Sequence, residues 1–128
     1  MENILLKECI EKLRNKQVHN LSVSNKIFQE ISEYVKFTFY GRIDWEMYSN
    51  KRKLFDVNDI LSLLNKNDIC LLLYNEASLP VIETKIEDFI SCIDDVLAVS
   101  FDTWVWIKKK NIIIEFFHDG EITLLELS

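Results

Sequence analysis

Apolar residues recur every three to four positions over the first third of the chain, which is the spacing of amphipathic helices. The pattern predicts a helix over residues 2–17 and a second helix that begins at Ser24, a residue type that caps helix N-termini well. A short helix is predicted over residues 57–65. A longer helix is predicted from Thr84 to about residue 97, because Thr84 and Glu87 have the spacing of a capping box.

Apolar runs in the second half of the chain predict strands. Residues 69–74 are apolar throughout, which fits a central strand buried on both faces. Another strand is expected over residues 98–107, and the order strand, helix, strand indicates a right-handed parallel crossover. Asp119-Gly120 is a strong signal for a two-residue hairpin turn between strands over residues 112–118 and 121–127.

The turns of these hairpins determine which side chains share a face of the sheet. A two-residue turn at Asp119-Gly120 pairs Glu115 with Leu124, and a turn over residues 108–111 pairs Trp104 with Glu115. Alternation then gives one face made of Trp104, Trp106, Ile113, Glu115, Phe117, Ile122 and Leu124. The opposite face is made of Val105, Ile107, Ile112, Ile114, Phe116 and Leu125.

These elements predict an α+β fold in a single domain over residues 1–128. The N-terminal helices are expected to pack on a mixed, mainly antiparallel sheet of about four strands, with one βαβ crossover and C-terminal hairpins. A hydrophobic content of 48% supplies a core for a chain of this length. Only 2 glycines and 1 proline are present, so the loops are expected to be short.

Charge is unevenly distributed along the chain. Residues 1–53 carry 10 Lys/Arg and 7 Asp/Glu, a net charge of +3, whereas residues 54–128 carry 5 Lys/Arg and 14 Asp/Glu, a net charge of −9. The overall charge of −6 argues against general nucleic-acid binding, which requires a basic surface. An acidic half suits a basic protein partner, and it equally serves solubility.

Several kinds of chemistry are not supported by the sequence. Three cysteines, at positions 9, 70 and 92, lie among apolar residues without a C-x-x-C spacing, which indicates reduced core thiols in a cytoplasmic protein. With 2 histidines and no phosphate-binding glycine motif, we expect neither a metal nor a cofactor. The charged N-terminal segment does not look like a signal peptide, and no apolar run has the length of a membrane span.

Four segments in order carry a family resemblance. They are GRIDW at residues 41–45, ASLPVI at 77–82, DDVLAVSFDTW at 94–104 and IIEFFHDGEITL at 113–124. From about residue 24 onward the chain resembles bacterial immunity proteins of contact-dependent growth inhibition (CDI) and related polymorphic toxin systems. The Lys108-Lys109-Lys110 turn departs from the family pattern, where acidic or polar residues are expected. The resemblance implies an inhibitor of a cognate toxin domain, often an RNase or DNase.

The predicted helix before residue 98 offers an acidic surface for such a partner. Glu87, Asp94 and Asp95 lie away from its apolar stripe. Asp94 and Asp95 near the end of a helix each cost about 0.3–1 kcal/mol against the helix dipole, which hints at a use outside folding. The alternative is an ordinary solvated helix face.

The following strand and the hairpin supply further candidates. Tryptophans are enriched at binding hot spots, so Trp104 and Trp106 beside Asp102 and Glu115 are candidate contacts, unless the N-terminal helices cover this face and make the rings part of the core.

Polar residues outside that strand complete the candidate set. Asp44 and Glu46 flank Trp45 in an irregular segment that is either a contact loop anchored by the tryptophan or an edge strand. His118 and Glu121 are predicted to face each other across the Asp-Gly turn as a cross-strand pair.

Three functions follow from these observations. The first is a toxin-neutralising protein that acts by stoichiometric occlusion, is not an enzyme, and binds neither nucleic acid nor membrane. The second is a small hydrolase that uses Asp102, Glu115 and His118 in one pocket with a perturbed carboxylate pKa. The third is a general protein-binding regulatory domain without a toxin partner.

Overall fold

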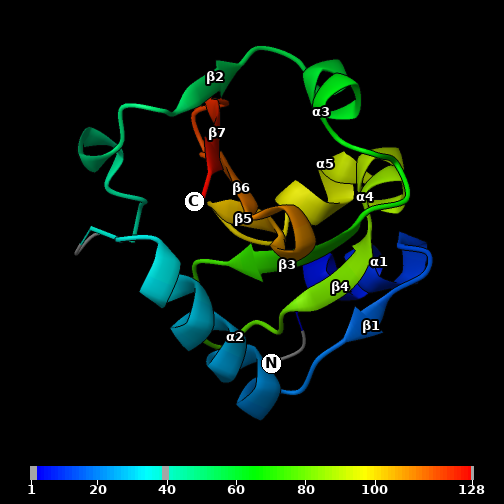
Figure 1. Ribbon diagram of the computed structural model, residues 1–128. Coiled ribbons are helices and arrows are strands. Elements are labelled where there is room, and N and C mark those ends of the chain that lie inside the picture. The colour runs from blue at the N-terminus through cyan, green and yellow to red at the C-terminus, as the bar shows by residue number, and fades with distance from the viewer. Residues whose placement is uncertain (1–2, 39–40, 128) are drawn as a thin grey trace.

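An antiparallel β-sheet organises the chain (Figure 1). The structure is a computed structural model that describes residues 3–38 and 41–127, so Glu2, at the start of the first predicted helix, lies outside it. Within those residues seven strands follow the order β1-β4-β3-β5-β6-β7-β2 across the sheet. The strands are β1 (Gln17–Val18), β2 (Arg52–Leu54), β3 (Ile69–Tyr74), β4 (Ile82–Lys85), β5 (Thr103–Ile107), β6 (Ile112–Phe116) and β7 (Ile122–Glu126).

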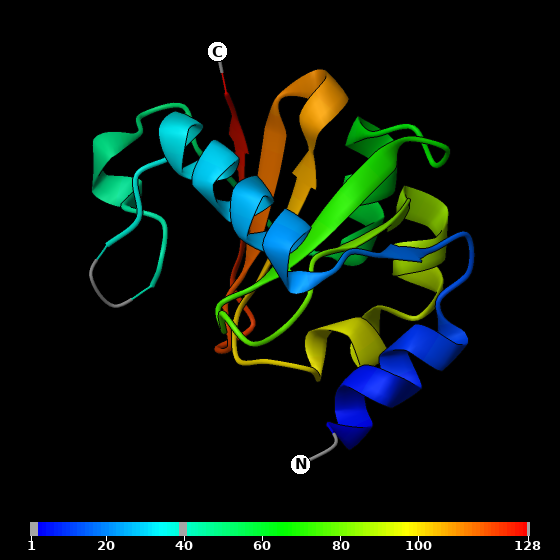
Figure 2. The same ribbon diagram turned by 90° about the horizontal axis from the view of Figure 1, so that it is seen from below.

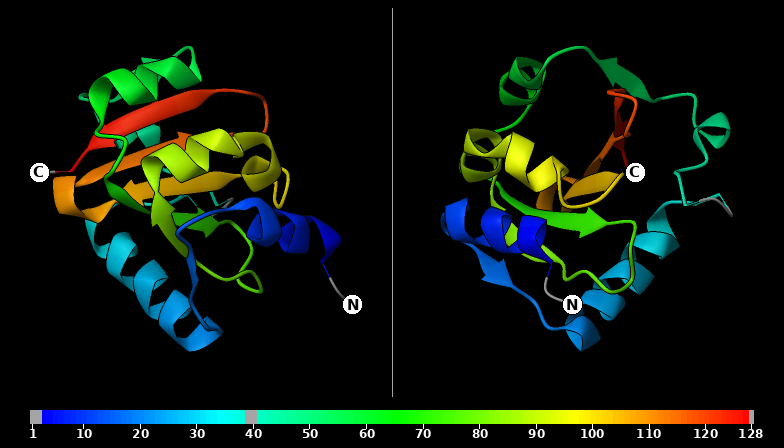
Figure 3. Two further views of the ribbon diagram at one scale, coloured as in Figure 1. Left: turned by 90° about the vertical axis from the view of Figure 1, so that its right-hand side faces the viewer. Right: turned by 180° about the vertical axis from the view of Figure 1, so that it is seen from behind.

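Helices cover both faces of the sheet. They are α1 (Ile4–Lys12), α2 (Leu21–Tyr34), α3 (Val57–Leu63), α4 (Ile86–Ser91) and α5 (Ile93–Leu97), with 3-10 turns η1 (Trp45–Met47) and η2 (Lys108–Lys110). Helix α2 lies across one face (Figure 2), and α1, α3, α4 and α5 lie on the other (Figure 3). The N-terminal helices therefore separate onto opposite faces instead of packing together on one.

Each face has its own apolar core. On the α5 side, Leu72, Val105 and Ile114 of the central strands pack with residues of the four covering helices. On the α2 side, Trp104 and Trp106 pack with Ile31, Val35 and other residues from α2 and the segment that follows it. Two-sided burial explains why the central strands are apolar at consecutive positions.

Several sequence predictions are confirmed. The α+β class is correct, the apolar run of residues 69–74 forms β3 in the middle of the sheet, and α3 lies within the predicted residues 57–65. The predicted β5–β6 register is also correct, since Trp104 pairs with Glu115 and Ile107 pairs with Ile112.

The predicted sheet is wrong in its strand count and in its direction. Strands β1, β2 and β4 were not predicted, so the sheet has seven strands instead of about four. The parallel crossover is wrong because β3 and β5 pair antiparallel, with Leu72 opposite Val105. The cause is β4, which returns antiparallel along β3 before the helices begin. One missed strand between two others reverses their relative direction.

The predicted helix from Thr84 to residue 97 is also different in the structure. Thr84 lies in β4, where its hydroxyl donates to the Arg14 carbonyl at 2.7 Å, and it caps no helix. The helical segment is divided at Cys92, whose φ of −133° and ψ of 36° separate α4 from α5.

Ser24 likewise caps no helix. The N-cap of α2 is Asn20, whose side chain accepts a hydrogen bond from the Val23 amide at 2.9 Å. Ser24 is buried in the first turns of α2, and its hydroxyl accepts from the Val81 amide at 2.9 Å. This bond fixes α2 to the residue preceding β4.

The C-terminal hairpin turns one residue earlier than predicted. The Gly120 amide donates to the Phe117 carbonyl, and Gly120 has a φ of +95°. This is a three-residue loop with glycine in the left-handed region, which is the next most common hairpin type after two-residue turns. Glu115 therefore pairs with Thr123 and not with Leu124.

A slip of one residue exchanges the two faces of a strand. Leu125 consequently lies in the core on the α2 side with the tryptophans, whereas Leu124 lies in the core on the α5 side. Ile122 also packs on the α5 side, opposite to its prediction.

Candidate functional site

Glu115 is a buried carboxylate at the centre of the α2 side of the sheet, with a relative exposure of 1%. One oxygen accepts from Arg42 Nε at 2.8 Å and Trp45 Nε1 at 2.9 Å. The other accepts from the Ile43 amide at 3.0 Å and Trp104 Nε1 at 3.1 Å. Four donors occupy this carboxylate, so Glu115 fastens the GRIDW segment to the sheet.

Arg42 extends this network to the β6–β7 turn. Its guanidinium pairs with Glu121 at 3.3 Å and lies 4.0 Å from the centre of the Phe117 ring. Burial lowers the pKa of Arg42, but hydrogen bonds and charge from Glu115 and Glu121 outweigh burial and raise it. Glu121 also pairs with Lys53 at 3.3 Å. Ion pairs of Arg42 with Glu115 and Glu121 therefore connect the GRIDW segment to the β6–β7 turn.

Trp45 is held in place by its hydrogen bond to Glu115, although its ring is not fully buried. Trp45 is half-buried and opens the η1 turn, while Asp44 is half-buried and Glu46 is exposed. The segment is a 3-10 turn and not an edge strand. A role of Asp44, Trp45 and Glu46 in partner binding stays a prediction.

Asp102 and His118 form a second polar cluster, at the end of the sheet that carries the β6–β7 turn. One Asp102 oxygen accepts from the His118 backbone amide at 3.0 Å and lies 3.1 Å from His118 Nδ1. The other accepts from the Asn75 side chain at 3.3 Å. Asp102 is 7% exposed. The predicted pairing of His118 with Glu121 is wrong, because the earlier turn directs His118 toward Asp102 and leaves Glu121 to Arg42.

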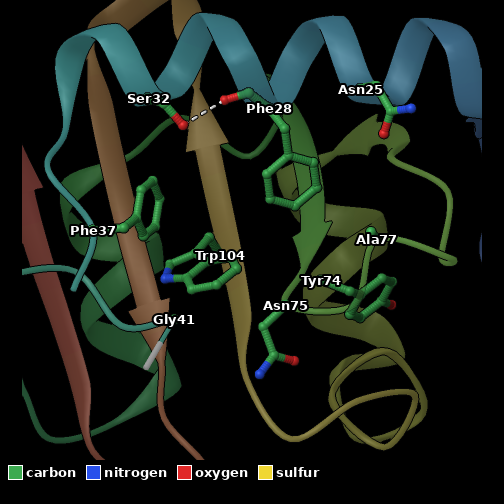
Figure 4. A pocket seen from close by; sticks show the side chains of 9 residues that line it. All are labelled: Asn25, Phe28, Ser32, Phe37, Gly41, Tyr74, Asn75, Ala77 and Trp104. Atoms are coloured by element: carbon green, nitrogen blue, oxygen red, sulfur yellow. Dashed lines mark hydrogen bonds between the residues drawn. The ribbon is translucent and has the colours of Figure 1, made fainter. Parts of the chain in front are cut away.

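A pocket of about 380 Å³ opens on the α2 side of this end (Figure 4). Phe28 reaches down from α2, Phe37 and Trp104 form a wall, and Asn75 lies at the rim beside the Asp102 cluster. Phe28 and Phe37 both meet the Trp104 ring edge-to-face. None of the described residues in the lining is charged.

Two adjoining pockets open on the α5 side of the same end, and we call them together the α5 groove. Their volumes are about 330 and 120 Å³, and they share four lining residues, Leu97, Phe116, Phe117 and Gly120. The larger pocket is also lined by Phe101 and His118, and the smaller by Asp94 and Glu121. The groove brings together residues that are far apart in sequence.

The acidic residues predicted on one helix face lie on two different surfaces. Asp94 faces the α5 groove, whereas Asp95 pairs with Lys12 of α1 at 3.1 Å and lines a separate pocket with Glu87. Both aspartates lie in the first turn of α5, because the helix is divided at Cys92. The helix dipole therefore favours them, and the predicted energetic cost is wrong.

A family model for the CdiI immunity protein, EcoliA0-like, matches residues 3–125. The chain belongs to this CdiI immunity family. The resemblance read from the four sequence segments is thereby confirmed. A search of curated proteins gives no significant match.

Two of the three tryptophans of this CdiI immunity protein, Trp104 and Trp106, lie in its interior. Trp104 is 2% exposed and Trp106 is 1% exposed, since α2 and the segment after it cover this face. Both rings pack in the core on the α2 side, as the alternative explanation of these residues expected. A role of Trp104 and Trp106 in partner binding stays a prediction.

The structure separates the three residues of the hydrolase alternative. Asp102 and His118 are in contact, but Glu115 is engaged with Arg42 and two tryptophans. Of the three side chains, the pocket on the α2 side is lined by none and the larger pocket of the α5 groove by His118 alone, as far as the described residues show. Over residues 3–38 and 41–127 there is also no group of His, Cys, Asp or Glu arranged to hold a metal ion.

The candidate site residues predicted from the sequence did not include Phe101, Phe117 or Arg42 of this CdiI protein. Phe101 is 78% exposed at the edge of the α5 groove, although it precedes a buried strand. The available signal was a large apolar residue directly before Asp102, but the strand predicted over residues 98–107 already included it.

The Lys108-Lys109-Lys110 turn forms ion pairs within the fold, since Lys108 pairs with Glu30 and Lys110 pairs with Asp68.

Proposed function

We propose that this CdiI immunity protein neutralises its cognate toxin by binding the toxin's C-terminal domain in a stoichiometric complex. The match to the immunity family over residues 3–125 carries this proposal. No helix in the described part of the chain is long and apolar enough to cross a membrane. We expect the encounter with the toxin to take place in the cytoplasm.

The partner we propose is a basic nuclease domain, either an RNase or a DNase. A nuclease must attract a polyanion, so its substrate surface carries Lys and Arg. Residues 54–128 of the immunity protein have a net charge of −9, which complements such a surface. Opposite charges also accelerate association, which matters for an inhibitor that has to capture a toxin before it acts.

We further propose that inhibition needs no catalysis by this chain. The carboxylate of Glu115 is saturated by four hydrogen bonds, so it is not free to act as an acid or a base. The hydrolase alternative would need Glu115 beside the Asp102–His118 pair. An inhibitor that acts by binding needs only a complementary surface.

Co-expression with the C-terminal domain of the toxin encoded directly upstream tests the proposal. We expect the toxin domain alone to stop growth, and the immunity protein to restore growth and to co-elute with the domain. A toxin domain from an unrelated system is the specificity control. Growth arrest that persists despite expression of the folded immunity protein would refute the proposal.

A titration separates occlusion from catalysis. Purified toxin domain is assayed on RNA and on DNA while the immunity protein is added in steps. Stoichiometric occlusion predicts that nuclease activity falls linearly and ends at one equivalent. Loss of activity at a small fraction of an equivalent would show turnover, and it would favour the enzyme alternative.

A further inference from the structure

We propose that the α5 groove is the surface that receives the toxin, and that it takes a segment in which an apolar side chain stands next to a Lys or Arg. The apolar side chain would enter the larger pocket, and the basic one would lie between Asp94 and Glu121 in the smaller pocket. This inference rests on the proposed function and specifies its partner surface. The exposure of Phe101 and the charge of Asp94 support it independently.

Phe101 provides the apolar part of the surface. Its side chain is 78% exposed, although it stands at the mouth of a pocket walled by Leu97, Phe116 and Phe117. Its ring lies 5.7 Å from the His118 ring in an edge-to-face arrangement, which gives an aromatic rim. Exposed aromatic residues beside a preformed pocket are typical anchors of protein interfaces.

Thr103 marks the wall of the same pocket. It is 0% exposed, and its hydroxyl has no hydrogen-bond partner within the described structure. Because the hydroxyl atom is itself buried, an occupant of the pocket does not reach it, and Thr103 does not select the side chain that enters.

Charge selects the side chain that enters the smaller pocket. The carboxylate of Asp94 has no ion-pair or hydrogen-bond partner among the described residues, and it lies in the groove with Glu121. None of the described residues that line the two pockets is Lys or Arg. Arg42 and Lys53 partly neutralise Glu121, so Asp94 supplies most of the attraction. A cationic side chain with an apolar stem fits this lining.

The pocket on the α2 side lacks this combination. Its lining is aromatic and amide-bearing, with Phe28, Trp104 and Asn75, and it contains no carboxylate. A basic toxin segment would gain no charge pairing there. The groove is therefore the better site for a partner selected by charge.

Isothermal titration calorimetry tests the proposal with the full immunity chain and a catalytically inactivated toxin domain. Phe101→Ala and Asp94→Asn probe the two halves of the groove. Glu33→Gln is the matched control, because Glu33 is an exposed carboxylate on α2 without a contact in the groove. The urea midpoint of each variant checks that the fold is retained, as expected for exposed positions.

We expect Phe101→Ala to raise the dissociation constant by roughly 30-fold, the level of an interface hot spot. Asp94→Asn should raise it by about tenfold, and its difference from the wild type should shrink in high salt. Glu33→Gln should bind like the wild type. A charge exchange completes the test. One toxin variant in which a Lys or Arg is replaced by Glu should bind the Asp94→Lys immunity protein more tightly than it binds the wild-type immunity protein.

The outcomes distinguish the two proposals. If the wild type binds tightly and both groove variants bind within about threefold of it, the groove is not the interface, while the immunity function stands. If the wild type itself fails to bind the toxin, the proposed function fails and this inference falls with it.

Discussion

Replacing Glu115 by glutamine tests whether one carboxylate holds the GRIDW segment on the sheet. The side chain keeps its volume, so packing around it is unchanged. One of its two oxygens becomes an amide NH2, which cannot accept a hydrogen bond. Each oxygen now serves two buried or half-buried donors, so two donors lose their acceptor whichever way the amide is oriented.

The expected cost follows from those bonds. A buried donor left without an acceptor costs about 1–3 kcal/mol, and the charged bond to Arg42 lies at the upper end of that range. Two lost acceptors therefore predict a loss of about 3 kcal/mol in the free energy of unfolding. That is a large part of the ~5–15 kcal/mol that stabilises an average domain. The melting temperature should fall by roughly 10 °C.

Urea unfolding followed by tryptophan fluorescence measures this loss directly, because Trp45 and Trp104 both donate to Glu115. The matched control is Glu126→Gln, an exposed carboxylate in the neighbouring strand β7. The control should change the free energy of unfolding by less than about 0.5 kcal/mol. A loss below about 1 kcal/mol for Glu115→Gln would refute the assignment of Glu115 as the fastening residue.

Three further predictions concern other parts of the fold. Ser24→Ala leaves the Val81 amide without an acceptor and should lower the free energy of unfolding by about 1–3 kcal/mol in the same assay. Gly120→Ala places a side chain at a φ of +95° and should cost about 1–2 kcal/mol of strain, although nothing obstructs the new methyl group. Burial raises the pKa of Cys70 and of Tyr74, so both groups stay neutral to a higher pH in the folded state than in the unfolded state. The stability they contribute is complete below the unfolded pKa of 9 to 10 and is lost above it, so urea midpoints should fall from pH 9 to pH 11.

The sequence predicts well where local pattern and topology agree. The β5–β6 register is correct because Lys108 to Asn111 form a polar run between two apolar segments, so the position of the turn is clear from the sequence. The β6–β7 register is off by one because Asp119-Gly120 fits both a two-residue and a three-residue loop. The same turn residues suit the two-residue and the three-residue loop, and only the packing of the strands selects one of the two loops.

Short strands account for most of what the sequence did not predict. Strand β4 contains the polar residues Glu83 and Lys85, and Thr84 imitates a helix cap, so the segment looks like the start of a helix. It is a strand because it can pair with β3. Arg42 could not be placed either, because its partners lie more than 70 residues away and depend on the corrected turn.

The position of β7 has a consequence for the order in which the chain folds. This last strand in chain order lies between β6 and β2, and β2 comes from the first half of the chain. A growing chain can make α1 and α2 early, but it cannot close the sheet until residues 122–126 have left the ribosome. Ile122 belongs to β7 and lines the smaller pocket, so the surface proposed to receive the toxin forms only when the sheet closes.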